Sequence, residues 1–249
     1  QARAGFLTVR SAGDLAVNAT VSDGFDSAFR GWSQNLDVTD TAWSYRLVAG
    51  ADASAANPLQ TTSGASGDLT VAGDTMVRTT SGSIELAAAG NIVLAAGSES
   101  DGTVYVAGAK RQGSASDPMS AILPLLPITS GMSEAQIVAA EAENQRTTHP
   151  NDATLAEVYA IPASFSHEGG RLEAHAGGDV LAQAANQGFS AWLNSALIDF
   201  DGVILGDFKA SVAWWANPDT FRQGLGSFGG GNLWVSAGGD VRNLTVVAP

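Results

Sequence analysis

Short stretches in which apolar and polar residues alternate recur along the chain and predict β-strands. Each is about three to five residues long, as at Leu7-Thr8-Val9, and is bounded by small turn-forming residues. Alternation with a period of two buries one face of a strand, so we expect Leu7 and Val9 on the buried face and Thr8 on the other. One such strand pair buries too little surface to be stable alone, which predicts that several pack together.

The strands belong to a cassette that occurs four times. It consists of a glycine, an alternating strand, a second glycine eight residues after the first, an Asp or Asn, and a further strand. The glycine pairs are Gly5 and Gly13, Gly82 and Gly90, Gly170 and Gly178, and Gly231 and Gly239. Glycine accepts a positive φ angle, and Asx side chains cap their own backbone in turns. The constant spacing predicts a repeat architecture.

The fold class that this pattern favours is all-β, a parallel β-helix in which each coil covers the inner face of the next. Successive coils would lie about 4.8 Å apart. A β-sandwich or β-barrel is the alternative, because it also uses short strands and regular turns. Its hairpins favour Asn-Gly or Asp-Gly turns, whereas the recurrent order here is Gly-Asp, which favours the corners of a coil.

Residues 1–249 are predicted to form one β-helical segment with three excursions from the repeat. The excursions are expected at about 22–66, 109–165 and 184–228. The second includes Ser133-Glu-Ala-Gln136, a capping-box pattern that predicts a short helix near 133–144. Long insertions in solenoids usually lie on one face, and often on the binding face.

Composition restricts the partners and the chemistry of the chain. The net charge of −13 disfavours nucleic acid and anionic membranes as partners, and the lack of cysteine excludes disulfides and thiolate metal sites. No run of eighteen apolar residues is present, so we expect no insertion into a membrane. A cassette begins almost at Gln1, without an initiator Met or a signal peptide, and we therefore expect a segment of a longer chain.

The cassettes resemble the repeat regions of the filamentous-haemagglutinin-like large exoproteins of Gram-negative bacteria. The resemblance rests on cassettes of the type Gly-x-Leu-x-Val-x-Ala-Gly-Gly-Asp-Val, on the segment 43–52 (Trp-Ser-Tyr-Arg-Leu-Val-Ala-Gly-Ala-Asp) and on residues 229–247. It implies a right-handed β-helical shaft that is exported by two-partner secretion through an outer-membrane transporter. It also implies a secreted or cell-surface location, and partners that are host-cell or matrix glycans or proteins, or copies of the chain end to end.

Three aspartates are the candidates for chemistry. Asp199, Asp201 and Asp207 lie close together in sequence and could serve as a carboxylate pair of a polysaccharide hydrolase or lyase, or as ligands of Ca²⁺. Solvated turn positions explain them better, since the full calcium-loop pattern is missing. His149, His167 and His175 lack metal-ligand spacing, and outward positions on neighbouring coils explain the last two better.

Aromatic residues in the excursions are the candidates for contact with sugars or a protein partner. They are Trp192, Trp214, Trp215, Trp43 and Tyr45. The alternative is that they pack the excursions onto the shaft as small satellite cores. We predict no cofactor and no catalytic residue, and a structural role in adhesion or in assembly of an extracellular filament or matrix. A polysaccharide lyase or hydrolase, or a carbohydrate-binding module, is the alternative.

Overall fold

The computed structural model describes residues 4–25, 42–64, 66–108, 133, 168–198, 211–216 and 218–248. This part of the chain is all-β, with two short 3-10 turns (Phe189–Ala191 and Pro218–Thr220) and no α-helix. The helix expected near 133–144 and most of the excursion 109–165 lie outside the described residues.

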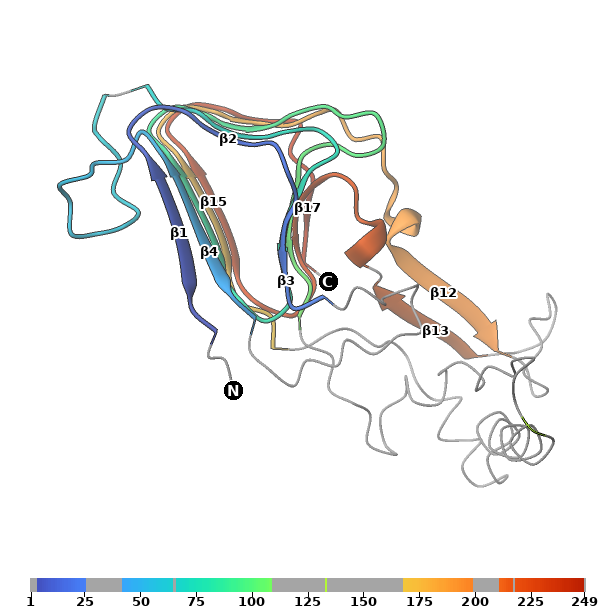
Figure 1. Cartoon of the computed structure of the whole chain (residues 1–249). Coiled ribbons are helices and arrows are strands. Elements are labelled where there is room, and N and C mark those ends of the chain that lie inside the picture. The colour runs from blue at the N-terminus through green and yellow to red at the C-terminus, as the bar shows by residue number, and fades with distance from the viewer. Residues whose placement is uncertain are drawn as a thin grey trace.

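Fifteen strands form three five-stranded sheets (Figure 1). Sheet 1 contains β1 (Phe6–Ser11), β4 (Ser44–Ala49), β7 (Ile84–Ala88), β10 (Leu172–Ala176) and β15 (Leu233–Ala237). Sheet 2 contains β2 (Leu15–Val17), β5 (Leu69–Val71), β8 (Ile92–Leu94), β11 (Val180–Leu181) and β16 (Val241–Arg242). Sheet 3 contains β3 (Val21–Asp23), β6 (Met76–Thr79), β9 (Thr103–Val106), β14 (Gly224–Ser227) and β17 (Val246–Val247).

The chain visits the three sheets in turn and then returns to the first. We number the resulting coils 1 to 5, so that coil 1 is β1, β2 and β3, and coil 5 is β15, β16 and β17. Every strand pair within the three sheets is parallel. Hairpin-linked strands of a sandwich would pair antiparallel, so the arrangement excludes that alternative and is compatible with a β-solenoid.

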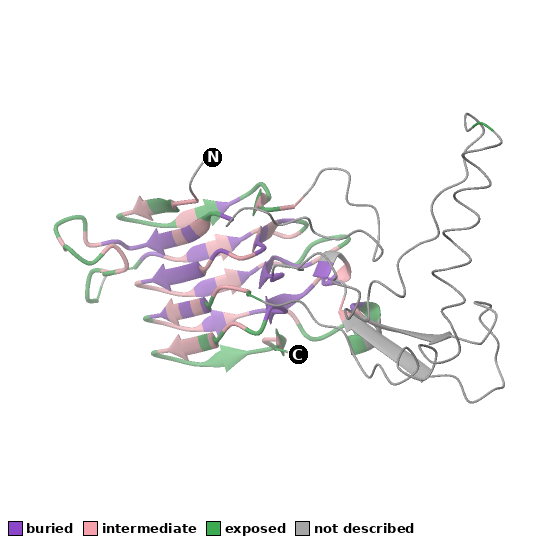
Figure 2. Cartoon of the chain, turned by 90° about the horizontal axis from the view of Figure 1, so that it is seen from below, coloured by how far each residue is buried: buried purple, intermediate pink, exposed green. Residues whose placement is uncertain are grey.

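The core lies inside the triangle that the sheets enclose, and it is built from columns of like residues. One column of sheet 1 contains Leu7, Tyr45, Ile84, Leu172 and Leu233. The facing column of sheet 3 contains Val21, Val77, Val104, Leu225 and Val246. Burial is greatest in the middle coils and least in the two end coils, because only the middle coils are covered on both sides (Figure 2).

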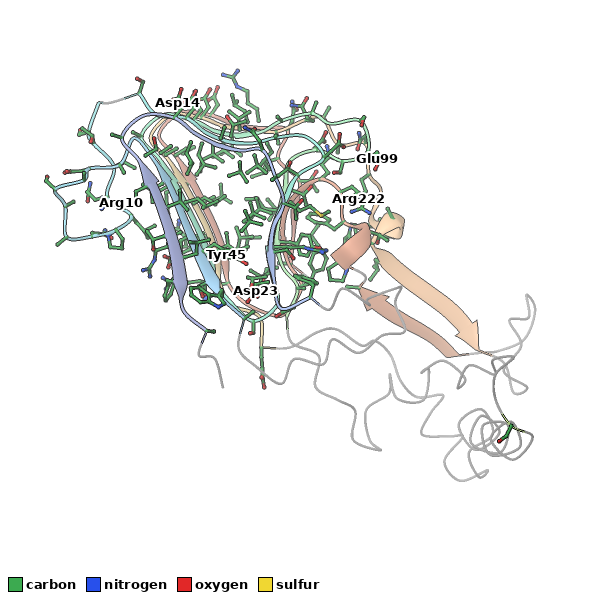
Figure 3. All side chains as sticks on the ribbon, viewed as in Figure 1. Arg10, Asp14, Asp23, Tyr45, Glu99 and Arg222 are labelled. Carbon is green, nitrogen blue, oxygen red and sulfur yellow. The ribbon has the colours of Figure 1, made fainter. Side chains whose placement is uncertain are left out.

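Asx side chains link the coils at the corner between sheets 1 and 2, where Asp14 lies (Figure 3). In coils 1 to 4 the Asx Oδ1 accepts the backbone N–H of the Asx in the next coil, at N···O distances of 2.7–2.9 Å. The five members of this Asx ladder are Asp14, Asp68, Asn91, Asp179 and Asp240. The sequence predicted that each Asx caps its own turn, but its oxygen instead satisfies the neighbouring coil.

In coils 3, 4 and 5 the glycine before the Asx makes room for this ladder. A Cβ atom at Gly90, Gly178 or Gly239 would lie within 3.0 Å of the Asx Oδ1 of the preceding coil, a separation that real Cβ atoms essentially never show. At Gly13, in coil 1, a Cβ would meet nothing within 4 Å. The Gly-Asx dipeptide therefore allows neighbouring coils to stack closely as well as allowing the chain to turn.

Asn91 is the one neutral rung of the Asx ladder, and Asn91→Asp is predicted to destabilise the chain at neutral pH. Carboxylates of neighbouring coils lie about 5 Å apart, and their repulsion costs about 0.5–1 kcal/mol at a largely solvated site. The repulsion raises the pKa of the introduced carboxyl above its value in the unfolded chain. The loss of unfolding free energy is therefore complete above that raised pKa and vanishes below about pH 4. Urea unfolding of both proteins at pH 7 and at low pH measures this, and an equal loss at both pH values would contradict it.

Two of the expected excursions contain strands of the coils. The range 22–66 includes β4, and the range 184–228 includes β14. The first cassette glycine of coil 2 is replaced by Trp43, whose neighbour Ser44 pairs with Phe6, so that coil lacked its sequence signature. A loop between β4 and β5, described at residues 50–64 and 66–68, belongs largely to the range 22–66 (Figure 1), and residues 26–41 lie outside the described residues.

Candidate functional site

The excursion between β11 and β14 carries an antiparallel hairpin away from the three sheets (Figure 1). The hairpin consists of β12 (Leu193–Ile198) and β13 (Ser211–Ala216). In its register Trp214 lies opposite Ser195, and Trp215 opposite Asn194. The candidate aspartates Asp199, Asp201 and Asp207 belong to the connection between these strands and lie outside the described residues.

An aromatic cluster attaches the base of this excursion to the outer face of sheet 3. Tyr105 points outward from β9, and its ring meets Phe25, Phe221 and Phe228 edge to face, with centroids 6.0–6.1 Å apart. The Trp192 ring lies 5.6 Å from that of Phe228. Edge-to-face pairs of this kind add stability beyond the area that they bury.

Trp192 is thereby buried, with only 9% of its surface exposed. It was a candidate for contact with a sugar or a partner, but it serves here as the satellite core that was the alternative interpretation. Gly226 leaves the space that the cluster needs, because a Cβ there would lie 2.6 Å from the Phe228 ring.

Two glutamines fasten the two ends of the excursion to each other. Buried Gln223 donates from Nε2 to Asp101 Oδ2 at 2.9 Å and to the carbonyls of Gln183 and Ala184, and its Oε1 accepts the N–H of Asn186. Gln187 accepts the N–H of Arg222 at 2.9 Å and donates to the carbonyl of Thr220 at 2.6 Å. A buried amide is expensive to leave unpaired, so these bonds hold the base of the excursion in one arrangement.

The two remaining aromatic candidates lie in coil 2 or beside it. Tyr45 is buried in the core, and burial, with Asp23 nearby, raises the pKa of its hydroxyl to about 12 (Figure 3). This side chain is therefore not accessible to a ligand. Trp43 is exposed at the corner before β4, where its ring would meet a Cβ atom at Gly5 at 3.3 Å.

The outer face of sheet 1 carries a buried carboxylate that the sequence did not single out. Glu85 is 1% exposed and accepts hydrogen bonds from Arg46 in the preceding coil and Arg171 in the next. Burial raises the pKa of Glu85, but the bonds from the two guanidinium groups outweigh it and hold the pKa below its usual value. The sequence did contain a signal for this site, because Glu85 is the only charged residue in β7, a strand that is otherwise small and apolar. The register of β4 and β7 then places Arg46 beside it.

Glu85→Gln is predicted to lower the free energy of unfolding by about 2–3 kcal/mol at pH 7, because two charge-assisted hydrogen bonds are weakened at a buried position. The folded pKa of Glu85 is depressed, so its contribution is present above the ordinary value of 4.5 and is lost as the pH falls through the depressed value. Chemical denaturation across pH 3–7 should give a shallower loss of stability in the variant. Parallel curves for the two proteins would contradict this assignment.

A serine, a histidine and a glutamate also meet on this face. His175 Nδ1 lies 2.7 Å from Ser236 Oγ, and its Nε2 lies 3.7 Å from Glu173 Oε2. Nucleophilic catalysis would need a carboxylate hydrogen-bonded to the second imidazole nitrogen, and oxyanion donors. Glu173 is too far for that bond and pairs with Arg171 at 3.2 Å, so the three side chains form an outward polar ladder.

His175 thus occupies an outward position between neighbouring coils, while His149 and His167 lie outside the described residues. Within the described ranges, no group of three or more His, Cys, Asp or Glu side chains could hold a metal ion. In the same part of the chain, no helix has the length and apolar character needed to cross a membrane.

Comparison of the chain with family models, with curated proteins and with solved structures gave no match. The interpretation of its function therefore rests on the geometry above and on the residues of the cassettes.

Proposed function

We propose that this chain is part of a right-handed parallel β-helical shaft of a secreted or cell-surface bacterial exoprotein, and that it acts in adhesion or in assembly of an extracellular filament or matrix. The observation that carries the proposal is the repeated register of five coils in three parallel sheets, linked by the Asx ladder. Such a stack grows in one dimension and suits a rod.

The cassettes and the segment 43–52 support the same function, because they resemble the repeat regions of filamentous-haemagglutinin-like exoproteins. In this proposal an outer-membrane transporter exports the chain. The β12–β13 hairpin, held at its base by Gln223 and the aromatic cluster, presents a contact surface for host or matrix glycans or proteins.

Location tests the first part of the proposal. Antibodies against the purified chain should label intact cells of the native source or detect the chain in the culture medium, and protease added outside the cells should remove the surface signal. Labelling that requires lysis of the cells would contradict an extracellular role.

Binding tests the second part. The chain applied to an array of glycans and matrix proteins should bind a subset, and the double variant Trp214→Ala/Trp215→Ala should lose that binding while its β signal in circular dichroism is unchanged. Trp234→Ala, which removes an exposed tryptophan from coil 5, is the matched control and should bind like the wild type. Equal binding by all three proteins would exclude the hairpin tryptophans as the contact.

A further inference from the structure

We propose that the hairpin of β12 and β13 binds an extended, uncharged segment of another protein, which adds to the outer edge of β13 as a third strand. The segment is recognised mainly through its backbone. This inference rests on the proposed function, in which the hairpin is a contact surface, and it names the class of partner and the mode of recognition.

Each strand of the hairpin has a neighbour on one side only. The two strands pair with each other from Leu193 opposite Ala216 to Ile198 opposite Ser211, and within the described part of the chain neither is hydrogen-bonded to a third strand. In an antiparallel pair, about half of the backbone N–H and C=O groups of each strand point away from the partner strand. The outer edge of β13 therefore presents alternating donors and acceptors that match the backbone of another extended chain.

Neither edge of the hairpin carries the features with which proteins usually protect exposed strands. Protected edges are short, bulged, or interrupted by proline or by charged side chains, above all lysine. β12 (Leu-Asn-Ser-Ala-Leu-Ile) and β13 (Ser-Val-Ala-Trp-Trp-Ala) contain no proline and no charged residue, and their register continues without a bulge. Unprotected edges of this length are suited to strand addition.

β13 offers the better of the two edges. It contains Val212, Trp214 and Trp215, whose residue types are enriched in strands because they pack well against cross-strand neighbours. β12 contains Asn194, a residue type that is depleted in strands. An added strand should therefore gain more from cross-strand pairs beside β13 than beside β12.

The hairpin is fixed at its base and extends from there away from the three sheets (Figure 1). Leu193 and Ala216, its first cross-strand pair, pack against the aromatic cluster, and Gln223 and Gln187 hold the segments on either side. The edge is thus positioned before a partner arrives, which lowers the entropy lost on binding. Two strands alone are marginally stable, so a third strand should also stabilise the hairpin itself.

Charge restricts the chemistry of the partner. A chain with a net charge of −13 repels a second copy of itself and other strongly acidic proteins. The uncharged strands of the hairpin offer no ion pair to a charged segment in return. A segment that has no charge and is rich in β-branched residues therefore fits this edge best.

Disulfide trapping tests which edge is used, because the natural chain contains no cysteine. The probe is a peptide of about ten residues in which Thr and Val alternate, with one central cysteine. Ala213 of β13 and Ala196 of β12 lie directly opposite each other, so Ala213→Cys and Ala196→Cys are matched variants. A strand added to β13 lies about 5 Å from Ala213 and about 10 Å from Ala196, and it should cross-link to Ala213→Cys about tenfold more.

Hydrogen exchange of the wild-type chain tests the backbone pairing. Saturating peptide should slow the exchange of amides in β13 (Ser211–Ala216), while amides of β4 and β7 exchange as before. A control peptide with two central prolines cannot complete the ladder of hydrogen bonds and should bind about tenfold more weakly in fluorescence anisotropy.

Equal cross-linking of the two variants, preference for Ala196→Cys, or peptide binding that leaves exchange in β13 unchanged would each overturn strand addition at β13. Dimers that Ala213→Cys forms with itself in place of the peptide would show that a second copy occupies the edge, and would overturn the choice of partner. A surface-located chain that binds glycans but not the peptide would refute only this inference. A chain that binds the peptide but is found only inside cells would refute the extracellular function alone.

Discussion

Gly178→Ala is expected to destabilise the chain by about 2–4 kcal/mol, whereas Gly13→Ala is expected to leave its stability unchanged or to raise it by up to about 1 kcal/mol. A Cβ at Gly178 collides with Asn91 Oδ1, so the coils must separate locally and the Asn91-to-Asp179 rung is lost. At Gly13 there is no such neighbour, and alanine only restricts the unfolded chain.

Urea unfolding of the two variants and the wild type measures the difference. Because a coil contacts only its neighbours, Gly178→Ala should weaken mainly the junction of coils 3 and 4. Amide exchange should therefore accelerate in β10 and β11 more than in β1 and β2. Equal stability of Gly178→Ala and Gly13→Ala would contradict the idea that the glycine exists to admit the Asx ladder.

The coils could be predicted from the sequence where the governing forces are local. Period-two alternation placed Leu172 in the core and Thr8 outside it, and the Gly-Asx dipeptides marked one corner of the coils. Coil 2 was not predicted as a complete cassette, because Trp43 stands where a glycine was expected and a loop separates β4 from β5. The alternation also predicted that the outer side chains of every strand are exposed to water, yet Glu85 and Ala87 on the outer face of β7 are buried.

Burial on the outer faces comes from contacts between distant parts of the sequence. Ala87 is covered by the loop after β4, and Glu85 lies between guanidinium groups 39 and 86 residues away. Gln223 reaches Asp101 across 122 residues. Pairs of this kind produce no periodic pattern in the sequence, so their contacts can be identified only when the register of the coils is known. The Asx bonds between coils were missed for the same reason.

Phe221→Ala is expected to cost about 3–4 kcal/mol and to release the base of the hairpin excursion. The Phe221 ring is fully buried and lies 5.3 Å from that of Phe228 and 6.1 Å from that of Tyr105, so its removal leaves a cavity between the excursion and sheet 3. Because Phe221 lies two residues before Gln223, the same change should loosen the bond to Asp101.

Phe189→Ala is the matched control, since this phenylalanine belongs to the same excursion but is largely exposed, and its loss should change stability by no more than about 0.5 kcal/mol. Limited proteolysis should cut Phe221→Ala within residues 184–223 well before it cuts either the control or the wild type. If the two variants are cleaved and unfolded alike, the aromatic cluster does not hold the excursion. If only Phe221→Ala is affected, the rigidity of the hairpin base comes from packing on Tyr105, and any binding by the hairpin should weaken with it.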